Sequence, residues 1–318
     1  MNTETSRIDM KGRVAIVTGA GGGLGREHAL LLARLGAKVL VNDLGGDVRG
    51  SGASGQSSRR VVEEIEAAGG EAMANDASVT DFAAVERMVG AVVSRWGRVD
   101  ILVNNAGILR DRTFAKMPLE DFRLVVDVHL MGAVHCTKAV WEIMRAQSYG
   151  RIVFTTSSTG LYGNFGQSNY AAAKAALVGL MQTLALEGAR HNIRVNCLAP
   201  SAGTRMLEGL MPQNALDLLT PGAVSPAVAV LCAEGAPTRR ILCAGAGSFE
   251  SAHVTLTRGI FLGTGDAVVQ ELQSRMEEVA DRSGERVPES GAAQSGLELS
   301  KAGLTGVSLG PEDPPRAP

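Results

Sequence analysis

Residues 13–43 read RVAIVTGAGGGLGREHALLLARLGAKVLVND, and this stretch decides the fold. It opens on an apolar run rich in β-branched side chains, which is typical of a buried strand. A glycine turn follows, then the helical pattern REHALLLARLG, then a second strand pattern, KVLVND, over 38–43. Strand, glycine turn, helix and strand make a βαβ unit, and such units predict a parallel sheet.

The alternation of strand and helix patterns continues to about residue 247. Further strands are predicted at 71–75, 99–105, 151–157, 193–199 and 239–245. We therefore expect a doubly wound (Rossmann) α/β domain over residues 1–250, with a seven-stranded parallel sheet and helices on both faces. Pro200 is expected to end the sixth strand, and the Met- and Leu-rich residues 201–222 to form a helical flap.

Residues 251–318 form a C-terminal extension with weaker patterns. The part up to about 282 can add a strand and a helix. From about 283 onward the chain is rich in Gly, Ser, Pro and Glu and lacks periodicity, so we expect that part to be disordered or loosely packed.

The composition excludes several classes of protein. A net charge of -2 over 318 residues gives no electrostatic footprint for nucleic acid. The N-terminal residues are polar, and no continuous apolar run is of the length that spans a bilayer, so we expect no membrane partner. The cysteines are scattered without a CxxC motif, which favours free thiols in a reducing cytoplasm and no metal site; they are Cys136, Cys197, Cys232 and Cys243.

Residues 157–174, SSTGLYGNFGQSNYAAAK, carry the groups that can do chemistry. Tyr170 and Lys174 are four residues apart on a predicted helix, so both side chains can point into one site. An ammonium beside a phenol favours the phenolate, and a serine hydroxyl can hydrogen-bond the same reacting oxygen. Ser157 is the candidate, with Ser158 as a competitor. This set can move a proton on or off an alcohol or carbonyl oxygen.

The glycine turn over 18–25 is a candidate dinucleotide site. It follows a strand and opens a helix, so its backbone can approach a pyrophosphate closely and offer free N–H groups. The alternative is a turn that binds nothing. The candidate contacts are Gly19, Gly23, Leu24 and Gly25.

Polar residues after the next strands extend this candidate site. Asp43 can accept hydrogen bonds from the adenosine ribose and would repel a 2′-phosphate, so it favours NAD over NADP, unless it only caps the turn before Gly45. Arg26 is a nearby cation that could weaken this exclusion. Asp76 can approach the adenine or cap a helix. The turn after the fourth strand would line the cofactor crevice with Asn105, Ala106 and Gly107.

With TGxxxGxG at 18–25, NNAG at 104–107, Ser157 and the Tyr170–Lys174 pair, the chain resembles the short-chain dehydrogenase/reductase family. The segments NDLGGD, NNAGILRDR, VHL and YGNFGQSNY are similar to the (3R)-hydroxyacyl-CoA dehydrogenase units of type 2 multifunctional enzymes and to related bacterial dehydrogenases. The resemblance covers about residues 10–247.

The resemblance implies an NAD-dependent oxidoreductase that acts on a secondary alcohol or ketone, of 3-hydroxyacyl-CoA or hydroxysteroid type. Tyr170 would be the acid/base, Lys174 would lower its pKa and hold the nicotinamide ribose, and Ser157 would position the substrate oxygen. The family spacing prefers Ser157 over Ser158. The family also implies a homodimer or homotetramer, built through helices at 119–147 and 169–190. The alternative is a non-catalytic NAD-binding sensor or scaffold of the same fold.

Several further positions each allow more than one role. His129 stands where most members of the family carry an Asn that holds a water in a proton relay, and it is either a relay residue or a satisfied core histidine. Thr204 lies in a turn that in the family closes on the nicotinamide carboxamide; it can serve there, cap the flap helix, or do both. Arg110, Arg112 and Arg205 are candidate cations for a CoA substrate or ordinary surface charges.

Overall fold

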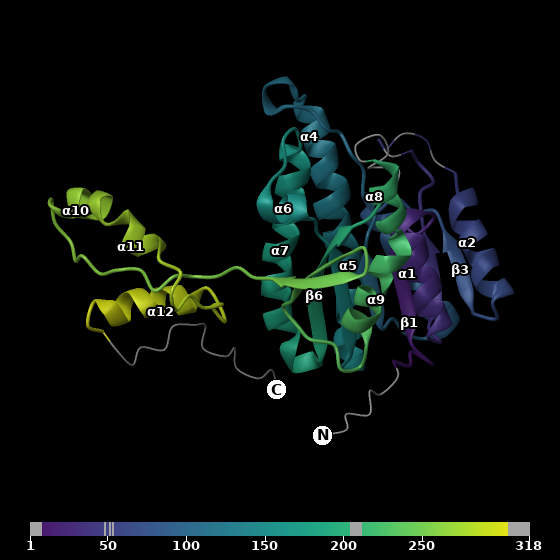
Figure 1. The fold of residues 1–318 in the computed structure, drawn as a ribbon. Coiled ribbons are helices and arrows are strands. Elements are labelled where there is room, and N and C mark those ends of the chain that lie inside the picture. The colour runs from purple at the N-terminus through teal and green to yellow at the C-terminus, as the bar shows by residue number, and fades with distance from the viewer. Residues whose placement is uncertain (1–7, 48, 51, 53, 204–211, 305–318) are drawn as a thin grey trace. The chain divides into compact units, whose positions relative to one another are not determined.

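The computed structural model describes residues 8–47, 49–50, 52, 54–203 and 212–304. The chain divides into two compact units, Met1–Ala252 and His253–Pro318. Figure 1 shows the order of the elements along the chain. In the first unit they are β1 (Val14–Thr18), α1 (Gly23–Arg34), β2 (Lys38–Asn42), α2 (Gln56–Ala67), β3 (Ala72–Asn75), α3 (Phe82–Trp96), β4 (Ile101–Asn104), α4 (Leu119–Val126), α5 (Gly132–Gln147), β5 (Gly150–Thr155), α6 (Ser158–Tyr162), α7 (Ser168–Gly188), β6 (Ile193–Ser201), α8 (Gln213–Leu218), α9 (Pro221–Cys232), β7 (Ile241–Gly245) and β8 (Ser248–Ala252).

The strands form a single sheet in the order β3-β2-β1-β4-β5-β6-β7-β8. Strands β1 to β7 pair in parallel, which confirms the doubly wound architecture. The order reverses between β1 and β4, so the carboxyl ends of these two strands border the crevice where such sheets bind ligands.

The expected strand count of seven was too low by one. β8 pairs antiparallel with β7 through a two-residue turn at Ala246 and Gly247, both with positive φ. This is the twist that suits a tight hairpin. Alanine is disfavoured at positive φ, so the sequence lacked the usual Asn-Gly or Asp-Gly signal for the turn.

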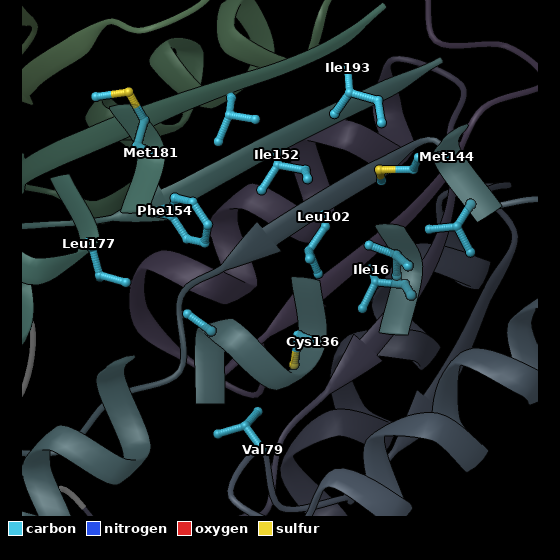
Figure 2. Close-up of a cluster of buried hydrophobic side chains, with 14 of the residues drawn as sticks. Ile16, Val79, Leu102, Cys136, Met144, Ile152, Phe154, Leu177, Met181 and Ile193 are labelled. Carbon is cyan, nitrogen blue, oxygen red and sulfur yellow. The ribbon is translucent and has the colours of Figure 1, made fainter. Parts of the chain in front are cut away.

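Two apolar cores lie on opposite faces of the sheet. One is built from sheet residues together with α3, α5 and α7, and includes Val85, Cys136 and Met181. Figure 2 shows this cluster, with Ile152 and Phe154 of β5 pointing toward Leu177 and Met181 of α7. The other core joins the sheet to α1, α2 and α9. The strands are therefore covered on both sides, as their nearly continuous apolar sequences require.

Two further boundaries differ from expectation. β6 runs through Pro200 to Ser201, since Pro200 pairs with Ala244 of β7 and a proline lacks only the N–H group. The long helix predicted over 119–147 is interrupted by a π-helical turn at Asp127–Met131, which separates α4 from α5. The pattern of apolar residues does not reveal this turn, although π turns often occur at functional sites.

By length and mean hydropathy (1.6), the segment Gln213–Cys232 could cross a membrane, contrary to our expectation from the sequence. In the structure it is two helices, α8 and α9, with Leu219 and Thr220 between them. α9 buries Val224, Val228 and Leu231 in the second core. Burial inside the protein therefore accounts for the apolar character of α9.

The second unit contains α10 (Val268–Ser274), α11 (Met276–Ala280) and α12 (Ala292–Lys301). Leu256 and Arg286 form an antiparallel bridge. α12 lies where the sequence predicted disorder, whereas 305–318 is outside the described residues. No residue between 253 and 304 is buried, so this unit has no apolar core of its own in the described part of the chain.

Candidate active site

The candidate site lies at the carboxyl edge of the sheet, where β1, β4 and β5 end. The hydroxyl of Thr18 accepts hydrogen bonds from the backbone N–H groups of Asn105 (3.0 Å) and Ala106 (3.1 Å). The side-chain amide of Asn105 donates to the carbonyls of Thr18 and Gly19, both at 3.1 Å. These bonds join the predicted glycine turn to the predicted NNAG turn across neighbouring strands.

The glycine turn is as tight as a dinucleotide site requires. Gly19 has a φ of +62°, and a Cβ on Gly25 would lie 2.2 Å from the carbonyl oxygen of Gly19, so neither position accepts a side chain without distortion. Helix α1 begins at Gly23, and its N-cap, Gly22, offers no side-chain hydrogen bond. The N–H groups of the first turn can therefore face an anionic group such as a pyrophosphate.

Asp43 lies beside this turn and is half-buried. Its carboxylate accepts from the backbone N–H of Gly21 (2.8 Å) and of Gly45 (2.7 Å) and from the hydroxyl of Ser57 (3.3 Å). The contact with Gly45 is the turn cap that the sequence left as an alternative. Because an ionised carboxylate has about four acceptor positions, these three bonds leave capacity for a ribose hydroxyl.

Two other predictions near Asp43 change. All three guanidinium nitrogens of Arg26 are engaged by Glu64 and Glu27, and these bonds raise its pKa. Arg26 is thus held by acidic partners and is not positioned to offset Asp43. Asp76 is exposed and does not cap a helix, since Asp81 is the N-cap of α3 and accepts from the N–H of Ala84 at 3.1 Å. The capping interpretation of Asp76 is therefore wrong.

The structure brings Ser157, Tyr170 and Lys174 together. Ser157 is the N-cap of α6, and its hydroxyl lies near enough to the phenol of Tyr170 to favour the phenolate. Lys174 is buried one helical turn further along α7, with its Nζ 5.5 Å from the centroid of the Tyr170 ring. The Lys174 ammonium donates to the carbonyl of Thr155 at 2.5 Å, and its own backbone carbonyl accepts from the hydroxyl of Thr156 at 2.7 Å.

The pKa values of this pair differ from the expected pattern. Burial lowers the pKa of Lys174 to about 7, which places its proton exchange near neutral pH. The pKa of Tyr170 is raised, mainly because burial disfavours the phenolate; the hydrogen bond from Ser157 opposes this and the charge of Asp111 adds to it. The expected lowering of the Tyr170 pKa by Lys174 is absent from this arrangement, because a lysine with a pKa of about 7 has lost its charge at the pH where the phenol ionises.

His129 lies in the π-helical turn, with its ring edge-on to Tyr170 at a centroid distance of 5.1 Å. Its Nε2 is 2.8 Å from the carbonyl oxygen and 3.1 Å from the N–H of Ile108, so it bonds one of them according to its tautomer. Burial and the nearby charge of Lys174 hold its pKa well below the usual value, so the ring is neutral at pH 7. A Cβ on Gly107 would lie 2.3 Å from His129 Cε1, which explains the glycine there.

A small cavity of about 10 Å³ lies behind the Tyr170–Lys174 pair, lined by Asn104, His129 and Lys174 among others. Within the described residues, the Oδ1 atom of Asn104 and the Nδ1 atom of His129 are buried without a hydrogen-bond partner. The amide nitrogen of Asn104 donates to the hydroxyl of Thr137 at 3.2 Å. A cavity of this size has room for about one water molecule, and these two atoms can bind it.

Sequence reasoning missed several groups that build the site. Thr18 was quoted only as part of the glycine motif, and the Thr155 carbonyl is a backbone group with no sequence signal. Asn169, fully buried beside Tyr170, donates to the carbonyl of Arg110 at 3.1 Å. Its position directly before the tyrosine was the one available hint. Thr204, Arg205 and the Met- and Leu-rich centre of the flap lie outside the described residues.

Comparison with known proteins agrees with this geometry. Residues 13–214, more than half of the chain, match the family model for short chain dehydrogenases. The peroxisomal multifunctional enzyme type 2 of Drosophila melanogaster is 52% identical over 234 residues, which cover 74% of this chain and 39% of the enzyme. In its full-length structure the match has a TM-score of 0.77 at 39% identity and covers 92% of this chain and 50% of that one.

Two further relatives are shorter. A short-chain type dehydrogenase/reductase of Mycobacterium tuberculosis is 46% identical over 276 residues, covering 86% of this chain and 96% of the relative. A 7α-hydroxysteroid dehydrogenase, solved with NADH and 7-oxo glycochenodeoxycholic acid, has a TM-score of 0.68 at 31% identity and covers 75% of this chain and 95% of that one. The chain thus spans under half of the Drosophila enzyme's sequence and nearly all of these two. It belongs to the short-chain dehydrogenase family.

Proposed function

We propose that this protein transfers a hydride between NAD and a secondary alcohol or ketone. The observation that carries the proposal is the meeting of Ser157, Tyr170 and Lys174 at the carboxyl edge of the sheet, beside a glycine turn that cannot accept side chains. The first group can move a proton, and the second can hold a dinucleotide. The family supports both roles.

The residues divide the work. When bound, the nicotinamide supplies or accepts the hydride. The free N–H groups of α1 and the carboxylate of Asp43 would hold the pyrophosphate and the ribose, while Asn105, Ala106 and Gly107 line the crevice. The hydroxyl of Ser157 orients the substrate oxygen beside the phenol of Tyr170. Tyr170 donates its proton to a ketone oxygen or takes one from an alcohol, and Lys174 exchanges protons near neutral pH.

His129 contributes through a water molecule in this proposal. In the tautomer whose Nε2–H donates to the carbonyl of Ile108, Nδ1 of His129 is an acceptor. A water in the small cavity would then donate to this Nδ1 and to Oδ1 of Asn104 and would face Lys174, which lines the same cavity. It would then carry protons between Lys174 and the interior of the site. The neutral ring suits this role, since Nε2 is taken by the backbone of Ile108. The Asn that the family usually carries is thus replaced in function by a histidine and Asn104 together.

For the substrate we propose a 3-hydroxyacyl thioester first and a hydroxysteroid second. The Drosophila melanogaster relative, which is 52% identical, is named as a multifunctional enzyme. Another relative, from Saccharomyces cerevisiae, is named as a hydratase-dehydrogenase-epimerase and is 51% identical over 227 residues. The hydroxysteroid enzyme is less similar, at 31% identity. This chain spans 25% of the yeast enzyme, and the proposal concerns the dehydrogenase reaction.

The test is the absorbance of NADH with a panel of 3-ketoacyl-CoA thioesters and ketosteroids, with wild type and Tyr170→Phe. We expect wild type to oxidise NADH with at least one thioester, and the variant to lose a factor of about 10³ in kcat/KM. NAD binding by both proteins with no turnover by either would favour a non-catalytic sensor instead. Tyr149→Phe is the matched control. That tyrosine is also buried, but it lies directly before β5, at the amino end of the strand and away from the site.

Cofactor choice has a separate test. Asp43 would repel a 2′-phosphate, and Arg26 is held by Glu64 and Glu27, so wild type should have a much lower KM for NADH than for NADPH. Asp43→Asn should reduce the ratio of the KM for NADPH to the KM for NADH by about tenfold, equivalent to 1.4 kcal/mol. Equal KM values in wild type would contradict the assignment.

We also propose a cytoplasmic homodimer or homotetramer. The free state of all four cysteines supports a reducing compartment, although several relatives are named peroxisomal. α7 carries apolar residues on more than one face and exposes Leu186, as an interface helix does. Sedimentation that shows only 33.1 kDa particles would refute the oligomer, and localisation of a tagged chain would test the compartment.

A further inference from the structure

A chain of hydrogen bonds runs from an exposed carboxylate to Ser157, whose hydroxyl acts on the candidate catalytic tyrosine. The carboxylate of Asp111 accepts from the amide nitrogen of Gln167 at 2.7 Å. The amide oxygen of Gln167 accepts from the hydroxyl of Thr159 at 3.1 Å. The backbone N–H of Thr159 donates to the hydroxyl of Ser157 at 3.2 Å, and this hydroxyl lies near enough to the phenol of Tyr170 to favour the phenolate.

Backbone bonds hold the two ends of this chain in place. The N–H of Arg112 donates to the carbonyl of Gly166 at 2.8 Å, on the residues next to Asp111 and Gln167. The buried amide of Asn169 donates to the carbonyl of Arg110 at 3.1 Å. The loop after β4 is therefore fastened to the start of α7 on both sides of Asp111, which holds the backbone of Asp111 near Gln167.

We propose that Asp111 and Gln167 are positioning residues, which fix the Ser157 end of the site and bias Tyr170 toward its protonated phenol. This inference rests on the proposed role of Tyr170 as acid/base. A protonated phenol is the form that donates to a ketone oxygen, so Asp111 favours reduction at neutral pH and moves alcohol oxidation to higher pH. The charge of Asp111 indeed acts on Tyr170 in this direction.

Other groups around the phenol set its surroundings. Lys174 faces it from α7 and His129 from the π-helical turn, while Ser157 approaches it from the start of α6. His129 is neutral and Lys174 titrates near 7, so neither supplies a negative charge. In the loop itself, Arg110 is paired with Asp121 at 2.8 Å. Asp111 is thus the carboxylate whose charge acts on Tyr170, from its position beside Gln167.

The experiment measures kcat/KM for alcohol oxidation against pH at low and high salt. Asp111→Asn keeps an acceptor for Gln167 and removes the charge, so the midpoint should move to lower pH by about 0.3–1 unit. The shift should shrink strongly at 1 M salt, where the screening length is about 3 Å. Gln167→Leu cuts the chain without changing charge, so it should lower kcat and leave KM for NAD unchanged. Gln167→Asn should restore part of kcat if the hydrogen bonds matter.

Glu120→Gln is the matched control, since it removes an exposed carboxylate from the first turn of α4, close in sequence to the same loop. A midpoint that is unchanged in Asp111→Asn at low salt, or moved equally in Glu120→Gln, overturns this proposal while the active wild type leaves the proposed function intact. Inactivity of wild type on every substrate would instead overturn the proposed function. Circular dichroism and NAD binding of each variant separate both results from misfolding.

Discussion

Buried polar groups are hydrogen-bonded to different extents at the amino edge of the sheet, where the parallel strands begin, and at the carboxyl edge, where they end. At the amino edge, the buried carboxylate of Asp100 accepts from the N–H of Val14 (2.9 Å), from Arg98 (2.6 and 2.7 Å) and from Arg13 (3.3 Å). Arg151, fully buried, donates to backbone carbonyls at 2.8–3.0 Å. The ring of Tyr149 lies between the guanidinium carbons of Arg13 and Arg151, which are 3.7 and 4.1 Å from its centroid.

At the carboxyl edge, the same kinds of group are left partly unsatisfied. Within the described residues, Asn104 Oδ1, His129 Nδ1 and Thr155 Oγ1 are buried without partners. Lys174 is buried and donates a hydrogen bond to the Thr155 carbonyl, and burial lowers its pKa to about 7. Saturated buried groups stabilise a fold, whereas unsatisfied ones cost stability and remain available for a substrate or a proton. The amino edge therefore serves stability, and the carboxyl edge serves the reaction.

The largest effect should come from Lys174→Met. Its activity should fall by a factor of about 10³ or more, because the variant cannot exchange a proton. Its stability at pH 7 should rise, since the unfolded lysine keeps a proton that the folded one loses at about 7 rather than 10.5. The whole difference is worth at most about 5 kcal/mol.

The pH dependence of that effect has a definite sign. Between pH 7 and 10.5 the unfolded chain binds more protons at this residue, so wild type gains stability as the pH rises and the variant lacks this gain. Urea unfolding at several pH values measures it. A variant that is less stable than wild type at pH 7 would show that Lys174 is satisfied after all.

Asp100→Asn should lower stability and leave activity nearly unchanged, the reverse of Lys174→Met. It removes a buried charge and leaves Arg98 and Arg13 without their shared carboxylate, so the free energy of unfolding should fall by about 3 kcal/mol. The specific activity of the folded protein should stay within about twofold of wild type, because the site lies at the other edge. Loss of activity without loss of stability would break the division between the two edges.

Thr155→Val should stabilise the protein by about 1 kcal/mol. The substitution keeps the shape of the side chain and removes a buried hydroxyl that has no partner within the described residues. The carbonyl that holds Lys174 is retained, so the readout is the shift of the urea midpoint. A loss of stability would mean that a bound water satisfies this hydroxyl.

The smallest effect is expected for Glu71→Gln, an exposed residue just before β3. Glu71 pairs with Lys38 at 3.0 Å and accepts from the indole of Trp96 at 2.5 Å. Because exposed pairs contribute less than about 1 kcal/mol, the unfolding free energy should change by less than that. A cost similar to that of Asp100→Asn would show that burial is not what separates the two.

Much of the fold followed from local patterns. β1 and β2, the glycine turn and α1 lie within about three residues of their predicted positions, because apolar periodicity and glycine placement report directly on strands, helices and turns. β8 was not predicted, because its turn has Ala246 at positive φ. The π-helical turn at His129 was not predicted either, because it interrupts a helix without changing the pattern of apolar residues.

The sequence by itself determined the alternation of strands and helices, the glycine turn and the shared helical face of Tyr170 and Lys174. These depend on spacings within single elements. Only the tertiary structure decided that Asp43 binds Gly21, that Glu64 holds Arg26, that His129 bonds Ile108 and that Asp111 reaches Ser157 through Gln167. Those contacts join residues far apart in the chain, and the order of the strands and the packing of α1, α2 and α7 bring them together.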